Sequence, residues 1–411
     1  MQNKYISIRK INLSRKTHAM LEQEYDARLR SPSTQVFDFH LGEYPVFVVL
    51  TPRLLAMIVR IHKDSARLTE LQQYALPDIC RQWYVTRILV DEIKLTNDME
   101  NVHSTRKEVK DAVESVERAD RPHNVRFYGM AAKYSSLLRN KQDALNTCAD
   151  VRKLYDDFMA REVVAEHAQD ALDGQIFRKE PVYVQDSHGK RIHDGSWPEP
   201  VIIENMERAL AILNDGEVDR LIRVAVFHYL FGYIHPFYNG NGRLSRFISS
   251  MMLSDELNTL AGLRLSYVIK DHKRQYDNLF KEANDLRGRG DLTDFVEAFC
   301  GYVNIALRDM IDNLEEGSEV IRDMQAFIDA TKEFKGYERV IEILGLNGLF
   351  AEDALSITDL MQHAECGRAK VQKGLNAARE MGLLTSTKDG HKYLYTIEPS
   401  AWLDLLKRSS T

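Results

Sequence analysis

Residues 235–246 of the 411-residue chain read HPFYNGNGRLSR. The apolar stretch Val218–Ile234 before them has helical periodicity, and so has Leu244–Leu253 after them. Pro236 ends the first helix, and the glycines of Gly240-Asn241-Gly242 permit backbone angles that other residues avoid. The sequence therefore predicts a tight loop that joins two helices.

The loop has the properties of an anion-binding site. Its successive N–H groups open onto the start of a helix, where the helix dipole favours negative charge. Arg243 falls in the first turn of that helix and Arg246 three residues further on, so both guanidinium groups lie on nearly one face. Two arginines beside such a loop suit a polyphosphate, which they can bind bidentately.

His235, at the start of the loop, is a candidate general base. A histidine has an ordinary pKa of about 6.5, which suits proton transfer at neutral pH. A base beside a phosphate site indicates that a hydroxyl group is deprotonated and then attacks phosphorus. Taken singly, His-Pro is usually a helix end and Gly-Asn-Gly is usually a turn. Their occurrence together with two arginines favours the catalytic interpretation.

This segment resembles the signature of the Fic (filamentation induced by cyclic AMP) family, HxFx(D/E)GNGRxxR, and the resemblance extends over roughly residues 80–305. It implies a mainly α fold, a Fic-type helical bundle with a β-hairpin flap. It also implies an enzyme, a protein adenylyltransferase that transfers AMP from ATP to a hydroxyl side chain of a target protein and releases pyrophosphate. ATP is then the substrate, and Mg²⁺ is the cofactor.

The resemblance gives the loop residues their roles. His235 would take the proton from the Ser, Thr or Tyr hydroxyl of the target. Arg243 would hold the β-phosphate and Arg246 the γ-phosphate, while Phe237 would anchor the loop in the core. The α- and β-phosphates would be bound by Gly240, Asn241 and Gly242.

One position departs from the family. The acidic residue that usually coordinates Mg²⁺ is Asn239 here. An amide oxygen can be a magnesium ligand, but it lacks the charge that makes carboxylate the preferred one. This position therefore bears on metal affinity, on nucleotide preference and on full activity.

An upstream segment, Thr96–Asn101 (TNDMEN), resembles the family's inhibitory helix motif, (S/T)xxxE(G/N). The resemblance implies that Glu100 pairs with Arg246 and blocks productive binding of the γ-phosphate. The four-residue spacing places Thr96 and Glu100 on one face of a helix, as this role requires. Thr96, Glu100 and Asn101 are therefore the candidate inhibitory residues, within the same chain as the site that they inhibit.

Two further segments resemble parts of the family's site. β-Prone stretches within 182–195 predict a hairpin that resembles the family's flap, where Val182 and Val184 would offer edge backbone groups to the target. Downstream, Tyr276 would stack on the adenine and Asn284 would hydrogen-bond its edge.

The C-terminal part changes character. A helix, a helix-turn-helix and a hairpin follow one another after residue 336 and resemble a small winged helix-turn-helix domain. Residues 368–392 carry six Lys or Arg and two Asp or Glu, a local net charge of +4. Such a patch suits a DNA backbone, although winged helices also serve in protein docking and dimerisation.

The predicted domains are an N-terminal α/β segment packed on the core, a Fic domain with its inhibitory helix, a connector and a winged-helix domain. They span residues 1–75, 76–310, 311–335 and 336–411. No internal repeat breaks this order.

Composition excludes several other classes. Lys and Arg number 55 and Asp and Glu 61, a net charge of −6, so the whole chain is not a polycation for nucleic acid. The four cysteines are far apart and form no CxxC pair, which excludes a disulfide scaffold and a cysteine zinc site. The N-terminus lacks a signal-peptide pattern and no apolar run is long enough to span a membrane, so we expect a cytoplasmic protein without a membrane partner.

Three alternatives to a self-inhibited adenylyltransferase stay open. The enzyme could use another nucleotide, or it could remove AMP from a modified target. The chain could instead be a DNA-binding regulator whose catalytically weak Fic core senses nucleotide, with Asn239 as the sign of lost catalysis. A kinase branch of the family lacks the second glycine of the loop, so Gly242 argues against that activity. The target protein and a homo-oligomeric state are left open.

Overall fold

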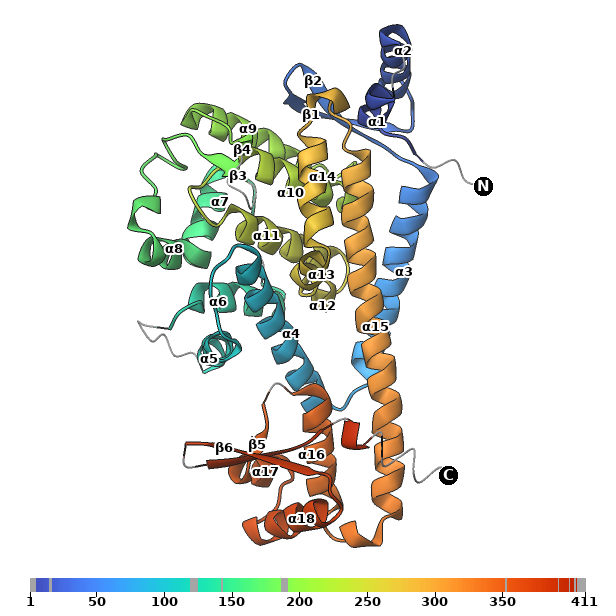
Figure 1. Cartoon of the computed structure of the whole chain (residues 1–411), viewed down its shortest axis with the longest axis vertical. Helices are drawn as coiled ribbons and strands as arrows, with labels where there is room; N and C mark the ends of the chain where they lie inside the picture. Colours follow the sequence, from blue (N-terminus) through green and yellow to red (C-terminus); the bar gives the residue numbers. More distant parts are fainter. Residues whose placement is uncertain are drawn as a thin grey trace. The chain divides into compact units, whose positions relative to one another are not determined.

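The computed structural model describes residues 5–14, 17–118, 125–141, 143–185, 191–351, 353–390, 392–398, 400–402 and 404. Within them the protein is mainly helical (Figure 1), as the sequence predicted. The described strands form two two-stranded sheets and one three-stranded sheet. All four cysteines are free thiols. In the described part of the chain, no helix has both the length and the apolar character needed to cross a membrane.

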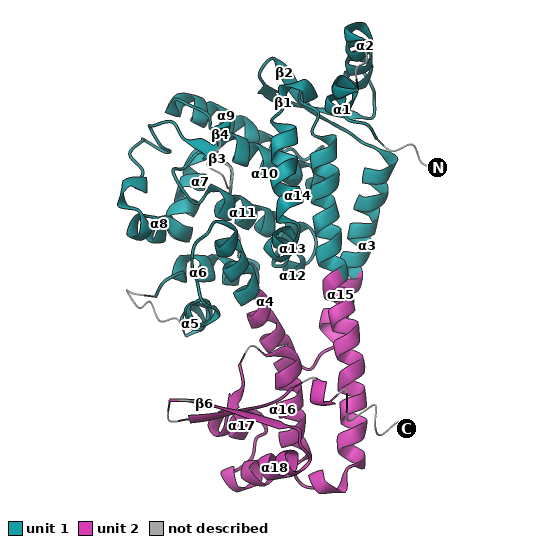
Figure 2. Ribbon diagram, in the orientation of Figure 1, with its two compact units in different colours: residues 1–66, 89–308 teal, residues 67–88, 309–411 magenta. Residues whose placement is uncertain are grey.

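The chain divides into two compact units (Figure 2). Unit 1 comprises residues 1–66 and 89–308, and unit 2 comprises residues 67–88 and 309–411. Each boundary falls inside a helix, so three helices contribute residues to both units: α3 (Pro52–Tyr74), α4 (Asp78–Met99) and α15 (Thr293–Ala330). The domain limits expected from the sequence stay predictions, because a boundary inside a continuous helix does not mark where a domain would fold by itself.

Unit 1 contains most of the other elements. Its helices are α1 (Ile8–Leu13), α2 (His18–Leu29), α5 (Arg106–Glu117), α6 (Tyr128–Leu137), α7 (Cys148–Tyr155), α8 (Arg161–Glu166), α9 (Glu199–Leu213), α10 (Arg220–Ile234), α11 (Asn241–Glu256), α12 (Thr259–Gly262), α13 (Leu265–Asp271) and α14 (Lys273–Ala283). Short π or 3-10 segments are η1 (Asp156–Ala160), η2 (Ala168–Asp170) and η3 (Leu286–Gly288). Its antiparallel strand pairs are β1 (Thr34–Leu41) with β2 (Tyr44–Val49) and β3 (Tyr183–Gln185) with β4 (Arg191–Asp194).

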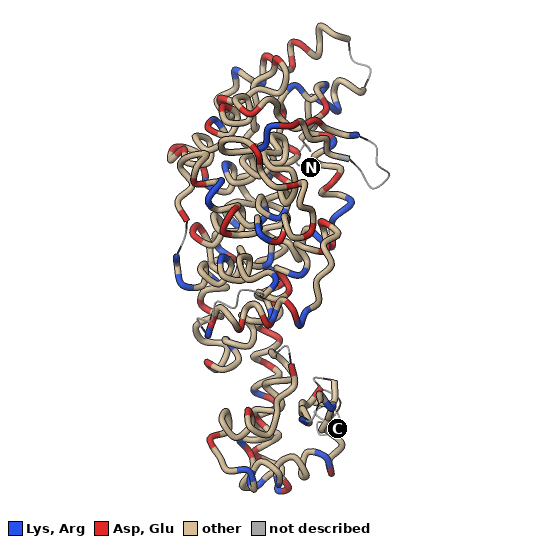
Figure 3. The backbone as a smooth tube through the Cα atoms, turned by 90° about the vertical axis from the view of Figure 1, so that its left-hand side faces the viewer, with Lys and Arg blue, Asp and Glu red and all other residues tan. Residues whose placement is uncertain are grey.

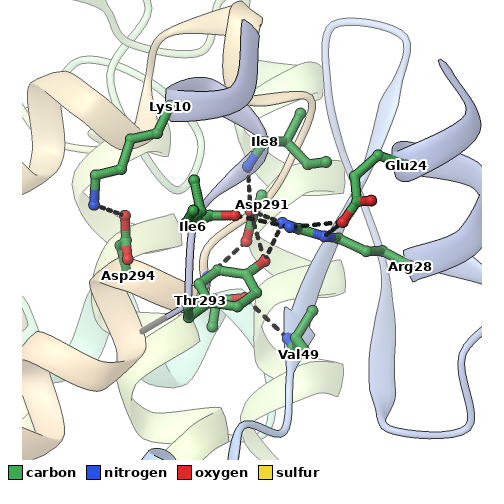
Figure 4. Close-up of polar contacts among 10 residues, drawn as sticks. Ile6, Ile8, Lys10, Glu24, Arg28, Val49, Asp291, Thr293 and Asp294 are labelled. Atoms are coloured by element: carbon green, nitrogen blue, oxygen red, sulfur yellow. Dashed lines mark hydrogen bonds and ion pairs between the residues drawn. The ribbon is translucent and has the colours of Figure 1, made fainter. Parts of the chain in front are cut away.

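The N-terminal segment is joined to the start of α15 through one buried carboxylate (Figure 4). Asp291 accepts hydrogen bonds from the Tyr5 hydroxyl (2.8 Å) and from the backbone N–H of Ile8 (2.9 Å). Nearby, the N–H of Phe47 donates to the carbonyl of Gly290 (2.9 Å). Burial raises the pKa of Asp291, and these donors stabilise its charged form. The first strands and helices of the chain therefore pack on the helical core.

The centre of unit 1 is α10 and the helix that follows it. Asp219 caps α10, since its carboxylate accepts from the N–H of Leu221 (2.9 Å). Nearly every residue of α10 is buried, which is the pattern of a helix surrounded by other helices. His235 ends it with φ 52°, and α11 begins at Asn241. The predicted helix–loop–helix around residues 235–246 is confirmed.

Unit 2 contains helices and a three-stranded sheet of order β5-β7-β6. Its elements are η4 (Lys332–Phe334), α16 (Glu338–Phe350), β5 (Leu355–Ser356), α17 (Ile357–His363), α18 (Arg368–Glu380), β6 (Leu384–Asp389) and β7 (Lys392–Ile397). The first half of α4 packs here, where Trp83 makes an edge contact with His363 and Tyr84 with Phe350. The elements follow in the predicted order, and the assignment of this unit to the winged-helix class stays a prediction.

Candidate active site

The loop between α10 and α11 is held rigidly by its own side chains. Phe237 is fully buried and stacks on Tyr155, with ring centroids 3.9 Å apart. The Asn241 amide bridges back to Phe237, accepting from its N–H (3.0 Å) and donating to its carbonyl (2.8 Å). Asn241 therefore shapes the loop with its side chain, and only its backbone N–H is left to face a ligand.

The glycines of the loop are required by close approach. Gly240 has φ 81°, and a Cβ there would collide with Met159 Sδ. Among the hydrogen bonds of the described residues, none takes up the N–H groups of Asn241, Gly242 and Arg243, the first three of α11. These donors and the positive end of the helix dipole form an anion cradle.

Arg243 lies beside this cradle without a partner. Its side chain is fully buried, and none of its three guanidinium nitrogens has a hydrogen-bond partner within the part of the chain that the structure describes. Burial lowers the pKa of Arg243, an effect that nearby Glu100 only partly offsets. Leaving a buried cation unpaired is costly, so this position indicates that an anion belongs there.

Arg246, one turn further along α11, is in contrast fully engaged. Its side chain is 2% exposed, and its Nε donates to the Thr96 hydroxyl (2.8 Å). Its Nη2 donates to the Thr96 carbonyl (3.1 Å) and to Glu100 Oε1 (2.8 Å). The structure thus contains the Glu100–Arg246 ion pair, and the acceptors of Arg246 are Thr96 in the last turn of α4 and Glu100 directly after its end. Asn101 follows the helix end with φ 58° and is exposed.

The carboxylate of Glu100 lies over the cradle itself. A Cβ added at Gly242 would collide with Glu100 Oε1, so this oxygen sits directly above the Gly242 backbone. Burial alone would raise the pKa of Glu100, but the charges of Arg246 and Arg243 hold it below its usual range. An ionised carboxylate therefore occupies part of the space that the cradle offers to an anion.

His235 is oriented as a neutral base. Its Nδ1 lies 3.3 Å from the carbonyl of Gly232, which can only accept, so Nδ1 carries the proton and Nε2 has the free lone pair. Burial lowers the pKa of His235 to about 4. The left-handed backbone angle at His235 is uncommon for a residue with a side chain, and such angles cluster at functional sites.

Arg178 contacts the backbone of His235, and no sequence motif identified it. It is fully buried, and its guanidinium donates to the backbone carbonyls of His235 (3.0 Å), Glu180 (2.7 Å) and Ser196 (2.8 Å). Burial lowers its pKa to about 10. Arg178 thus joins the end of α10 to both sides of the β3–β4 hairpin. Because its acceptors are backbone carbonyls, and those of His235 and Ser196 are distant in the sequence, no local pattern predicts it.

The hairpin that was predicted between residues 182 and 195 is present as β3 and β4, whereas its turn, with Ser187-His188-Gly189, lies outside the described residues. Val184 pairs with His193, and the carbonyl of Val182 accepts from Gly195 (3.1 Å). That the edge of this hairpin binds the backbone of a target protein stays a prediction.

Tyr276 and Asn284 both form hydrogen-bond contacts with side chains of α10. Tyr276 is 8% exposed, and its hydroxyl is 2.7 Å from His228 Nε2. The Asn284 amide oxygen accepts from the hydroxyl of Tyr229 (2.8 Å). Arg246 acts electrostatically on Tyr276, which places this phenol near the site. Their proposed contacts with the base stay predictions.

Asn239 lies beside one carboxylate, that of Asp170. The amide oxygen of Asn239 accepts from the N–H of Gly240 (2.7 Å), and its amide nitrogen donates to Asp170 Oδ2 (3.2 Å). No group of three or more His, Cys, Asp or Glu that could enclose a metal occurs among the described residues. Mg²⁺ is commonly bound through one or two carboxylates together with substrate phosphates, so a single carboxylate at this place fits that ion in company with a nucleotide.

These features define a class of protein: a helical domain in which a histidine ends one helix and a glycine-bounded anion cradle opens the next. Residues 147–253 match the model of the Fic/DOC family. The fold of this chain is similar to that of a Fic family protein from Desulfovibrio desulfuricans G20. That likeness has a TM-score of 0.51 at 22% identity and covers 84% of this chain and 96% of the other.

Sequence relatives carry the name protein adenylyltransferase Fic. The protein from Drosophila mojavensis is 28% identical over 151 residues, 36% of this chain and 27% of that protein. The protein from Drosophila sechellia is 30% identical over 127 residues, 31% of this chain and 23% of that protein. The matched region thus spans about a quarter of the length of these relatives. The likeness concerns the Fic domain and supports a family of AMP transferases in general.

Proposed function

We propose that this chain is a protein adenylyltransferase that transfers AMP from ATP to a hydroxyl side chain of a target protein, and that Glu100 holds it inactive. The observation that carries the proposal is Arg243. Its guanidinium is buried, and neither it nor the adjacent row of backbone N–H donors has a hydrogen-bond partner among the described residues. A polyphosphate supplies the oxygens that such a set of donors lacks.

The reaction needs one base and a site for the leaving group. Nε2 of His235 takes the proton of the target hydroxyl while the oxygen of that hydroxyl forms a bond to the α-phosphorus. The bond from that phosphorus to the oxygen bridging to the β-phosphate breaks, and its electron pair leaves with pyrophosphate. Arg243 and the first N–H groups of α11 stabilise the charge that develops on the leaving phosphates.

Inhibition follows from the contacts of Arg246. This arginine cannot offer its guanidinium to a terminal phosphate while Thr96 and Glu100 accept from it. The Glu100 carboxylate would also repel a phosphate placed over Gly242. Removing that carboxylate frees Arg246 and removes the repulsion, so we expect the γ-phosphate to bind productively only then.

The decisive experiment labels ATP at either the α- or the γ-phosphate. Wild type, Glu100→Gly, His235→Ala and Glu100→Gly/His235→Ala proteins are incubated with Mg²⁺ and each nucleotide, and label on protein is read from a gel. α-Label in the Glu100→Gly protein, with little in wild type and none in a Glu100→Gly/His235→Ala protein, is the expected result. γ-Label alone would mean phosphate transfer and would overturn the proposal, as would nucleotide binding without any label.

The same assay separates the remaining enzymatic alternatives. Labelled GTP, CTP and UTP in place of ATP test the choice of nucleotide. Release of AMP from a pre-labelled target by the wild-type protein would indicate hydrolysis: water attacks the α-phosphorus, the bond to the target oxygen breaks, and AMP and the free hydroxyl are the products.

A second candidate function rests on unit 2. Charged residues of both signs are interspersed along the chain (Figure 3), but α18 and the β6–β7 hairpin carry basic side chains that are all exposed. They are Arg368, Lys370, Lys373, Arg379, Lys388 and Lys392. A DNA-binding regulator would bind duplex DNA with an affinity that falls steeply with salt. Lys373→Glu should then weaken binding, whereas the exposed Arg322→Glu on α15 should not. Salt-independent or absent binding would exclude this function.

A further inference from the structure

We infer that Asp170, on η2, is the carboxylate that binds the divalent cation of the nucleotide, and that Asn239 positions Asp170 and is not itself a ligand. The inference rests on the proposed function, because a cation at this place needs phosphate oxygens to complete its coordination. The family motif has an acidic residue where this chain has Asn239, and the inference assigns the missing negative charge to another segment of the chain.

The side-chain oxygen of Asn239 is already engaged within the loop, because it accepts from the N–H of Gly240 at 2.7 Å. As a neutral amide oxygen it is also a weaker magnesium ligand than a carboxylate. What Asn239 presents outward is its amide nitrogen, a donor, and a donor does not ligate a cation. That donor is directed to Asp170 Oδ2 at 3.2 Å. The amide therefore holds a carboxylate in place, as the outer partners of metal ligands commonly do.

Asp170 is held beside the loop by more than this one contact. Its backbone N–H donates to the carbonyl of His167 (2.9 Å), which closes the short turn of η2. Three residues further on, Asp173 accepts from the hydroxyl of Tyr238 (2.8 Å), the loop residue next to Asn239. The segment that carries Asp170 is thus hydrogen-bonded to two consecutive residues of the loop, Tyr238 and Asn239, and these bonds keep the carboxylate beside the loop.

The carboxylate also lies near the phosphate-binding arginine. The hydroxyl of Tyr155 is buried, it has no hydrogen-bond partner among the described residues, and its pKa responds to both Arg243 and Asp170. The charges of Arg243 and Asp170 therefore both act on one buried phenol, whose ring stacks on Phe237 of the loop. Asp170 is half-buried, and its Oδ1 makes no hydrogen bond in the described part of the chain. One carboxylate oxygen near a phosphate site is the arrangement by which Mg²⁺ is usually held.

The test uses Mn²⁺ as the probe, because it prefers the same oxygen ligands and is visible by electron paramagnetic resonance. Full-length wild-type, Glu100→Gly, Asp170→Asn and Asp156→Asn proteins are titrated with Mn²⁺ in the presence of ADP. Asp156 is the matched control. Like Asp170, Asp156 raises the pKa of Tyr155 through its negative charge, but it is exposed and forms an ion pair with Arg152. ADP affinity is measured separately in EDTA.

We expect Asp170→Asn to weaken Mn²⁺ binding to the ADP complex at least about tenfold, with ADP affinity in EDTA unchanged and Asp156→Asn like wild type. Asn239→Asp supplies a carboxylate in the loop and should tighten Mn²⁺ binding in the Asp170→Asn protein. This double variant keeps the test informative if Asp170→Asn alone folds poorly.

Two results overturn the inference in distinguishable ways. Equal Mn²⁺ affinity in wild type and Asp170→Asn, with ADP bound by both, would remove Asp170 as ligand and leave the proposed function standing. Failure of both wild type and Glu100→Gly to bind ADP, with or without Mn²⁺, would end the proposed function and this inference with it.

Discussion

Glu100 Oε1 lies 2.8 Å from Nη2 of Arg246 and at the same time directly above the backbone of Gly242. One carboxylate thus satisfies an arginine and covers part of the anion cradle. The ion pair joins the residue that follows α4 to α11, and Arg246 also donates twice to Thr96 in the last turn of α4. Inhibition in this chain, as proposed, is therefore a competition between a carboxylate and a phosphate for the same donors.

Glu100→Gln tests that competition by charge alone. The amide keeps nearly the same shape and can still accept from Arg246, but it no longer repels phosphate. We expect ATP to bind more tightly than in wild type, by about tenfold if roughly 1.4 kcal/mol of repulsion is removed, and ADP affinity to change less. Calorimetric titration with both nucleotides measures this. Equal gains for ATP and ADP would show that Glu100 does not act on the terminal phosphate.

Replacing either buried arginine by methionine should give opposite changes in stability. Arg243 has no hydrogen-bond partner in the part of the chain that the structure describes, so Arg243→Met removes an unsatisfied buried cation. It should raise the free energy of unfolding by about 1–3 kcal/mol while abolishing nucleotide binding. Arg246→Met breaks three contacts and leaves Glu100 unpaired, so it should lower that energy. Urea unfolding without nucleotide measures both. A loss of stability in Arg243→Met would mean that its guanidinium already has a partner in the protein.

Much of this site could be predicted because its signals are local. Pro236 and the glycines of the loop mark a helix–loop–helix, and the three-residue spacing of Arg243 and Arg246 is a property of any helix. Glu100 was found only through the resemblance, since its partner is 146 residues away. Asp170 and Arg178 have no local signal, because both act through contacts with segments far along the chain.

The boundaries of long helices were harder to predict. Residues 311–335 read as a charged connector with a helical pattern, and α15 runs without a break from Thr293 to Ala330, so the helix begins well before that stretch. The connector itself stays a prediction. Nothing in that stretch caps or interrupts a helix apart from Gly317, which is packed closely against Phe350. A glycine that permits a close contact within a helix looks the same in sequence as one that ends it.

The pH dependence of transfer should report the burial of His235. Because burial lowers its pKa to about 4, the base is neutral well below the ordinary histidine range. Glu100 raises this pKa, so in Glu100→Gly protein it lies lower still. We expect the transfer rate of that protein to stay level from neutral pH to about pH 5, where an ordinary histidine would be largely protonated. The pH–rate profile measures it, and a midpoint near about 6.5 would contradict the buried state.

The same burial predicts the direction of acid stability. A histidine whose folded pKa lies below its unfolded value binds protons more readily when unfolded, so the protein loses stability as pH falls below the unfolded pKa of about 6.5. His228, fully buried with its pKa lowered to about 3 by burial, acts in the same sense. Thermal unfolding of wild type should therefore shift to lower temperature between about pH 7 and about pH 5. His235→Gln should reduce that shift, and an unchanged slope in this variant would show that His235 titrates normally.

Arg178 should act as a positioning residue for His235. Its guanidinium holds the backbone carbonyl of His235 at 3.0 Å, and its charge lowers the pKa of that histidine. In a Glu100→Gly background, Arg178→Ala should slow transfer by about 10²-fold through misplacement of the base, with the KM for ATP little changed. The acidic midpoint of the pH–rate profile should also move to higher pH, because a positive charge has been removed. Arg178→Lys keeps that charge but not the planar set of donors, so it should restore the midpoint without fully restoring the rate. A raised KM with an unmoved midpoint would instead assign Arg178 to nucleotide binding or to the fold alone.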